Sequence, residues 1–237
     1  MIPASPLRGF LAAVAGLVGF TAIAEEVGER AGIVMVDRDV LEFVGTHRTP
    51  DVVAAMGLVT HLGGAIALLI VAVLGGLAVG VARRSWAPPI LLAVTLVGAG
   101  VAVWVLKGLI ARPRPPAALA VYIERGYGFP SGHTTHATAG YLMLAVLVTV
   151  TARRRWVRVT AWVSAMLVVA AVGVSRVVLG VHAPSDVLAG WLLGLSWVAL
   201  VASVWWSLKR TRLVRAVPAR SAAPLGDGIV GPRNDRE

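Results

Sequence analysis

The chain has 237 residues, of which 57% are hydrophobic and only 14% are charged, and its mean hydropathy is +0.80. Soluble domains carry about 25% charged residues, so this composition indicates a membrane protein and excludes an ordinary soluble domain. The absence of cysteine excludes disulfides, cysteine-ligated zinc and thiol catalysis. The net charge is +10, and the basic residues that produce it lie between apolar runs. We therefore interpret them as a signal of membrane topology and expect no nucleic-acid partner.

Six mostly apolar stretches are candidates for membrane spans, each of which needs about 20 residues. They predict an all-α, polytopic membrane bundle of six transmembrane helices, formed by a single domain over residues 1–215. The stretches cover residues 9–24, 55–82, 86–108, 134–152, 159–176 and 187–208. Residues 216–237 are rich in Pro, Gly, Ala and charge, which predicts a disordered cytoplasmic tail.

The first stretch has two interpretations. It suits a short span, but Arg8, the apolar run and the sequence Ala22-Ile23-Ala24 also resemble a cleavable signal peptide. Cleavage would leave five spans with the same sidedness.

Basic residues sort to one side of the predicted spans. They lie at Arg8 and within residues 83–84, 153–158 and 209–215. The opposite side holds residues 25–51, with seven acids and three arginines. The positive-inside rule therefore predicts that both termini are cytoplasmic and that the acidic segment lies outside the cell membrane.

Three polar clusters fall on the predicted outer side, where ionisable groups near spans are functional candidates. The first runs from Lys107 to Arg114-Pro115 at the end of the third span. The prolines should end that helix, because proline lacks an amide donor. A purely structural interpretation is that these cations bind lipid headgroups.

The second cluster is Pro130-Ser131-Gly132-His133, directly before an apolar helix. Ser131 is a candidate N-cap, and Gly132 permits close approach of a ligand to the backbone. Free amides at a helix start favour an anion. An ordinary turn and cap is the alternative, but His133 adds a proton donor beside the predicted anion site.

The third cluster contains Ser175-Arg176, His182 and Asp186. Pro184 suits the first position of a helix, which puts Asp186 in its first turn. A carboxylate near one imidazole nitrogen fixes the tautomer and leaves the other nitrogen free to attack. The structural alternative is a capping Asp next to an interfacial His.

Together these residues supply what phosphoryl transfer requires without a metal or cofactor. Lys107, Arg114 and Arg176 would neutralise the phosphate oxygens. His182 would attack phosphorus and Asp186 would hold it. His133 would protonate the leaving oxygen and then activate water. A metal held by His133 and His136 is a weaker hypothesis, because no acid lies near them in the sequence.

The same residues resemble the signature of the type 2 phosphatidic acid phosphatase superfamily, the lipid phosphate phosphatases, in its bacterial integral-membrane branch. That signature is Lys, six residues, Arg-Pro; then Pro-Ser-Gly-His; then Ser-Arg, five residues, His, three residues, Asp. Every spacing is met between Lys107 and Asp186. Arg112 is outside the signature, and its role is left open.

The resemblance implies a helical core with the active site at the outer membrane surface, and metal-independent hydrolysis through a phosphohistidine. By matching position, it implies catalytic roles for His182, His133 and Asp186. It also implies phosphate binding by five residues, which are Lys107, Arg114, Ser131, Gly132 and Arg176.

The predicted substrate is a lipid phosphate, with undecaprenyl diphosphate, phosphatidylglycerophosphate and phosphatidate as candidates that the sequence does not separate. The alternatives at the same site are a sugar-phosphate phosphatase and a vanadium haloperoxidase. A transporter or scaffold without turnover is an alternative of a different class. Nothing in the sequence indicates an oligomeric state.

Overall fold

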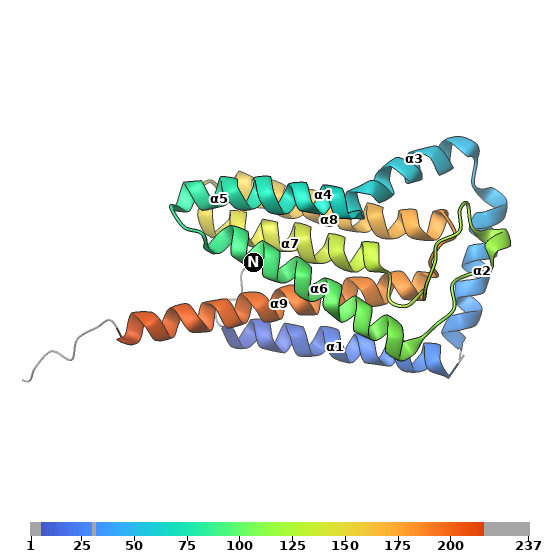
Figure 1. The fold of residues 1–237 in the computed structure, drawn as a ribbon, viewed down its shortest axis with the longest axis horizontal. Coiled ribbons are helices and arrows are strands. Elements are labelled where there is room, and N and C mark those ends of the chain that lie inside the picture. Colours follow the sequence, from blue (N-terminus) through green and yellow to red (C-terminus); the bar gives the residue numbers. More distant parts are fainter. Residues whose placement is uncertain (1–5, 30–31, 216–237) are drawn as a thin grey trace, which may run out of the picture.

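The computed structural model describes residues 6–29 and 32–215, and this part of the chain is mainly helical, with no strand (Figure 1). The predicted all-α fold is therefore confirmed. The predicted tail at 216–237 lies outside the described residues. The helices are α1 (Pro6–Gly28), α2 (Gly32–His47), α3 (Pro50–Thr60), α4 (Ala65–Ile70), α5 (Gly76–Arg83), α6 (Ala87–Ile110), α7 (Gly132–Thr151), α8 (Arg155–Val178) and α9 (Pro184–Arg215).

Six helices in the described residues are long and apolar enough to cross a membrane, as predicted. Five of them match predicted stretches to within a few residues. These are Pro6–Gly28, Ala87–Ile110, Gly132–Thr151, Arg155–Val178 and Pro184–Thr211.

The remaining span differs from its predicted bounds of 55–82. Its helix covers Ala65–Arg83, with a π-helical segment, η2, over Val71–Gly75. The apolar run is interrupted by a 3-10 turn, η1 (His61–Gly63), and by Gly64 in an extended conformation. Residues 55–60 therefore belong to α3, which leaves the bundle at an angle (Figure 1). A Cβ on Gly63 would lie 2.6 Å from Val172, so this glycine allows the turn to pack against α8.

Small residues let α9 lie close to its neighbours in the centre of the bundle. A Cβ on Gly194 would lie 2.6 Å from the Thr138 side chain, and one on Gly16 would lie 2.3 Å from the Ser196 hydroxyl. Such close approach through small residues is typical of membrane helix packing. It holds α9 against α7 and α1, so cleavage after Ala24 would remove a helix that packs along α9.

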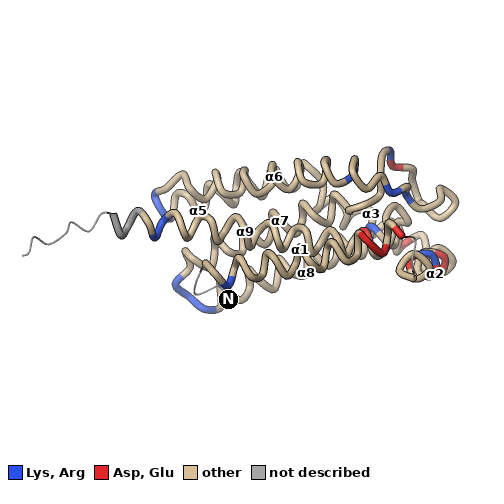
Figure 2. Tube along the Cα trace, turned by 90° about the horizontal axis from the view of Figure 1, so that it is seen from below, with Lys and Arg blue, Asp and Glu red and all other residues tan. Residues whose placement is uncertain are grey.

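Charged residues gather at the two ends of the bundle (Figure 2). One end carries basic residues, at the α5–α6 turn, the α7–α8 turn and the end of α9. The first residues of α1 lie at this same end (Figure 1). The other end carries both acids and bases, and α2 crosses it with α3 alongside (Figure 1). The three polar clusters of the sequence lie at this second end.

Candidate active site

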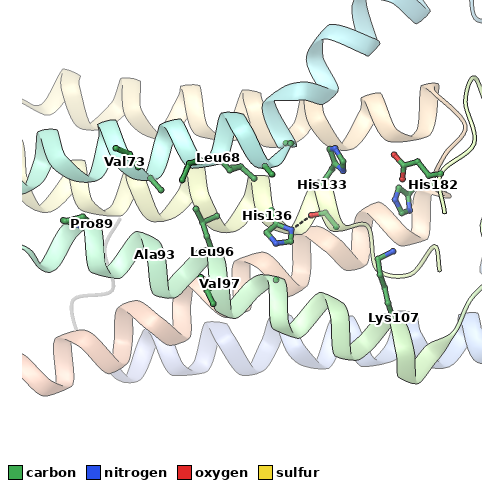
Figure 3. Close-up of a pocket in the computed structure, with 18 of the residues that line it drawn as sticks. Leu68, Val73, Pro89, Ala93, Leu96, Val97, Lys107, His133, His136 and His182 are labelled. Atoms are coloured by element: carbon green, nitrogen blue, oxygen red, sulfur yellow. Dashed lines mark hydrogen bonds between the residues drawn. The ribbon is translucent and has the colours of Figure 1, made fainter. Parts of the chain in front are cut away.

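The predicted site residues converge at the end of the bundle that α2 covers. Lys107 lies in the last turn of α6, which ends at Ile110 because Ala111 turns to a left-handed conformation, with φ of 49°, ahead of the Arg-Pro-Arg-Pro segment. Its ammonium group donates to the carbonyl of Tyr127. Figure 3 shows Lys107, His133 and His182 at one end of an elongated cavity. Separate elements thus bring together three residues that the sequence spreads widely.

His182 lies in the turn between α8 and α9, with its side chain buried. Pro184 begins α9 and Asp186 lies in its first turn, as predicted. The Asp186 Oδ2 is 3.3 Å from His182 Nδ1 and also accepts the Ala183 amide at 2.9 Å. We assign the proton to Nδ1, because a carboxylate only accepts. Nε2 then carries the free lone pair.

Burial lowers the pKa of His182, and the hydrogen bond and charge of Asp186 oppose that effect only in part. The net shift is downward, so the imidazole is neutral at pH 7. A neutral ring is the form that can act as a nucleophile.

Arg114 reaches this lone pair from the loop after α6. Its Nη1 lies 3.2 Å from His182 Nε2 and donates to the carbonyl of Val181 at 3.0 Å. The same nitrogen is 2.8 Å from a carboxylate oxygen of Glu124. Arg114 therefore lies where it can hold an anion next to the imidazole.

Arg176 is fully buried near the end of α8 and donates to the same carboxylate through Nη2. Its Nη1 donates to the hydroxyls of Thr60, at 2.7 Å, and Tyr122, at 3.0 Å. Its Nε has no hydrogen-bond partner among the described residues. A buried donor without a partner is unfavourable. Arg176 does not itself line the cavity that contains His182 and His133, but its partner Glu124 does.

Glu124 bridges the two guanidinium groups from the loop before α7, and sequence reasoning missed it. Burial raises the pKa of Glu124, but the charge and hydrogen bond of Arg176, together with the charge of Arg114, outweigh that effect and lower it. Its carboxylate is thus ionised, and it lies between two of the cations predicted to bind phosphate. The only sequence signal for it was an acid inside the predicted site loop.

The Pro-Ser-Gly-His segment forms the start of α7, and here the structure differs in one detail. Ser131 occupies the N-cap position, but its hydroxyl accepts from Thr134 at 2.9 Å and caps no amide. It is fully buried and lies outside the cavity wall, whereas Gly132 and His133 line the cavity. The first amides of α7 remain available to an anion, as at any helix start.

His136 follows one turn later and its Nδ1 lies 2.7 Å from the Gly132 carbonyl (Figure 3). This contact gives His136 a local hydrogen-bonding role. Within residues 6–29 and 32–215, no group of three or more His, Asp or Glu side chains is arranged to hold a metal ion.

A cavity of about 920 Å³ runs from these polar groups along apolar faces of the span region. Its polar end is lined by Lys107, Arg114, Glu124, His133 and His182. Leu68, Val73, Leu96 and Val97 line the rest, between the α4–α5 helix and α6 (Figure 3). The site thus combines a cationic end with a long apolar wall.

A third arginine, Arg112, lies behind the site between two carboxylates. Its guanidinium contacts Asp186 at 2.6 Å and Asp37 of α2 at 2.7 Å. From the sequence alone, the role of Arg112 was left open, and Asp37 counted only as one of the acids in the outer segment. Pairing across 75 residues has no local sequence signal.

These features define a multi-pass membrane protein with a buried, cation-rich site that contains a carboxylate-paired histidine. The model of the PAP2 superfamily matches residues 88–210, which contain every predicted site residue. The chain is 35% identical over 174 residues to phosphatidylglycerophosphatase B of Bacillus subtilis, covering 70% of this chain and 81% of that one. It is 34% identical over 167 residues to decaprenylphosphoryl-5-phosphoribose phosphatase of Mycobacterium tuberculosis, covering 69% and 86%.

A solved structure agrees with this relationship. The crystal structure of a transmembrane PAP2-type phosphatidylglycerolphosphate phosphatase from Bacillus subtilis superposes with a TM-score of 0.77 at 29% identity. The match covers 84% of this chain and 98% of that one. The chain belongs to the PAP2 superfamily and is a membrane phosphatase, which confirms the predicted family and enzyme class.

Proposed function

We propose that the chain hydrolyses a lipid phosphate through a phosphohistidine on His182, at a site that opens to the outer side of the cell membrane. The single observation that carries the proposal is the cavity, because its cationic end and apolar wall fit a phosphate head joined to a lipid tail. A sugar phosphate has no tail to cover that wall.

The names of the two relatives support the same substrate class. One refers to a phosphatidylglycerophosphate and the other to a decaprenylphosphoryl phosphoribose, which are both lipid phosphates with different tails. What these molecules share is the phosphate ester, and the polar end of the cavity is built to bind that group. We therefore propose the class, which includes undecaprenyl diphosphate, phosphatidylglycerophosphate and phosphatidate.

The first chemical step is attack by His182 Nε2 on phosphorus. A bond forms between nitrogen and phosphorus while the bond from phosphorus to the lipid oxygen breaks. Asp186 holds Nδ1–H and stabilises the positive ring as it forms. His133 lines the same cavity and gives its proton to the leaving oxygen.

The second step returns the enzyme to its starting state. Water attacks the phosphorus, gives a proton to His133, and the nitrogen–phosphorus bond breaks to release inorganic phosphate. Lys107, Arg114 and Arg176 neutralise the phosphate oxygens in both steps.

Phosphate binding requires Glu124 to leave its position between Arg114 and Arg176. We expect Glu124→Gln to strengthen inhibition by inorganic phosphate or vanadate about tenfold, because the neutral side chain competes less for the two guanidinium groups. The inhibition constant is measured on purified protein. The matched control is Glu42→Gln, which removes an exposed acid paired with Arg38 on α2. Unchanged or weaker inhibition by the Glu124 variant would contradict this account.

The test of the function is phosphate release from a panel of lipid phosphates and sugar phosphates by the purified wild-type chain. We expect release from lipid phosphates and little from soluble sugar phosphates. Equal or better turnover of sugar phosphates, or bromide oxidation with vanadate in place of phosphate release, would contradict the proposal.

The same assay in excess EDTA tests metal independence. We expect phosphate release to persist, because protein cations supply the charge that a divalent metal would otherwise provide. Complete loss of activity in EDTA, restored by Mg²⁺ or Zn²⁺, would refute this part of the proposal.

The orientation follows from the basic end of the bundle, which we place in the cytoplasm. The chain contains no cysteine, so a single introduced thiol reports the side. We expect Tyr127→Cys to react with an impermeant maleimide in intact cells, and Trp86→Cys, at the other end, to react only after lysis. The opposite pattern would reverse the orientation.

A further inference from the structure

The side chain of Arg112 lies between two buried carboxylates, next to the proposed active site. We propose that Arg112 is a positioning residue, which together with Asp37 fixes Asp186 and, through Asp186, the His182 imidazole. The inference rests on the proposed function, since it concerns the same histidine.

The contacts define a buried Asp–Arg–Asp cluster. The Nη1 of Arg112 is 2.6 Å from Asp186 Oδ1, and its Nη2 is 2.7 Å from Asp37 Oδ2. The exposed fractions of these side chains are 13% for Arg112, 4% for Asp37 and 1% for Asp186. Removing the cation would leave two buried carboxylates with no strong partner between them, which is costly.

Asp37 is itself attached to the start of α9. Its Oδ1 accepts the Ser185 amide at 2.8 Å, and its Oδ2 accepts the Ser185 hydroxyl. The Ser185 hydroxyl also lies 2.7 Å from Arg112. The cluster therefore joins α2, the loop after α6 and the first turn of α9, which is the turn that carries Asp186.

The two carboxylate oxygens of Asp186 have different partners. Oδ1 binds Arg112, whereas Oδ2 faces His182 Nδ1 and the Ala183 amide. Arg112 thus determines which oxygen faces the imidazole. It also offsets the negative charge of Asp186, which otherwise favours a protonated, non-nucleophilic ring.

Arg112 stays charged in this position. Burial lowers the pKa of Arg112, but Asp186 and Asp37 outweigh that effect, so its pKa lies above the ordinary value. The guanidinium therefore stays positively charged between the two carboxylates.

The two arginines of the Arg-Pro-Arg-Pro segment share one cavity, and only Arg114 also lines the cavity of the proposed active site. Arg114 lines the cavity of about 920 Å³ that contains His182 and His133. Arg112 does not line that cavity; it lines a second one of about 350 Å³ next to α2, where Arg114 and Asp186 also form part of the wall. Both terminal nitrogens of Arg112 contact buried carboxylates, so we infer that Arg112 acts on the reaction through Asp186.

The positioning role of Arg112 is tested in the full chain by comparing Arg112→Gln with Arg112→Lys and with Arg38→Gln. Arg38 is the matched control, an exposed arginine next to Asp37 that pairs only with Glu42 among the described residues. We expect Arg112→Gln to lower kcat about 10- to 100-fold with little change in KM, because the nucleophile is misplaced while the phosphate-binding cations remain. Arg112→Lys should recover part of the loss, and Arg38→Gln should match the wild type.

Two readouts separate positioning from a general structural role. The acidic limb of the kcat/KM–pH profile should move to higher pH in Arg112→Gln. An Asp186 without its arginine partner raises the pKa of His182, so the imidazole becomes protonated, and inactive, at a higher pH. In addition, Arg112→Gln should lower kcat only slightly when Asp186 is already replaced by Asn, so the effects of the two substitutions on kcat should be non-additive.

The charged or titratable groups facing His182 are Asp186, Arg114, Arg176, Glu124, His133 and Lys107.

Asp37→Asn is the second variant and should shift kcat and the acidic limb in the same direction even if Arg112→Gln fails to fold. If the folded variants keep the kcat and pH profile of the wild type, or if the double-mutant cycle is additive, the positioning role of Arg112 is wrong while the proposed function stands. Absence of phosphate release by the wild type, or full activity of His182→Ala, would instead overturn the proposed function.

Discussion

Replacing His182 with alanine is expected to lower lipid phosphate hydrolysis by about 10⁴-fold or more, because the nucleophile itself is lost. No other described imidazole approaches both Asp186 and Arg114 as His182 does. The measurement is phosphate release by purified His182→Ala at saturating lipid phosphate, with thermal unfolding recorded to show that the variant is folded.

The matched control is His47→Ala, which removes an exposed imidazole at the same end of the bundle. His47 stacks on Phe43, with ring centroids 4.2 Å apart, and takes no part in the site. It should retain wild-type activity. Turnover by His182→Ala within tenfold of the wild type would rule out His182 as the essential nucleophile.

Replacing His133 with alanine is expected to lower hydrolysis of a lipid phosphate by about 10²- to 10⁴-fold, because the leaving alkoxide then departs without a proton. The loss should be smaller in the first step for an aryl phosphate such as p-nitrophenyl phosphate, whose leaving group needs no protonation. The measurement is a rapid-mixing assay of p-nitrophenol release.

A burst of p-nitrophenol followed by slow turnover is the expected result for His133→Ala, because water activation is also lost and the phosphoenzyme accumulates. The control is His136→Gln, which keeps a polar group one turn further along α7, near the Gly132 carbonyl. An equal loss for aryl and lipid phosphates, without a burst, would show that His133 is not the leaving-group acid.

Much of the fold follows from hydropathy, because a span without charges has few other stable environments. The exception was the segment at 55–82, where an unbroken apolar run hides a bend at Gly63-Gly64. Hydropathy does not record such a bend. It depends on the close contact of Gly63 with Val172, a residue far away in the sequence.

The site was predictable where its geometry is local. His182, Pro184 and Asp186 follow one another within five residues, so helix-start rules were sufficient to predict the contact between the imidazole and the carboxylate. Ser131 was the local exception, because Thr134 binds its hydroxyl in place of an amide.

The residues that were missed form contacts over long sequence distances. Glu124 meets Arg176 across 52 residues and Asp37 meets Arg112 across 75. Neither acid belongs to a motif with fixed spacing, and each resembles an ordinary solvated acid until the helices are assembled. Only the tertiary structure shows that Glu124 lies between Arg114 and Arg176, and that Asp37 pairs with the arginine that also contacts Asp186.

The most direct test of the central claim is to trap the covalent intermediate. Purified His133→Ala chain would be mixed with ³²P-labelled substrate, quenched in base, digested and analysed by mass spectrometry. The account predicts a phosphoryl group that is stable in base, labile in acid and located on His182, and absent from His133→Ala/His182→Ala. Label on another residue, or no labelled protein while phosphate is released, would contradict it.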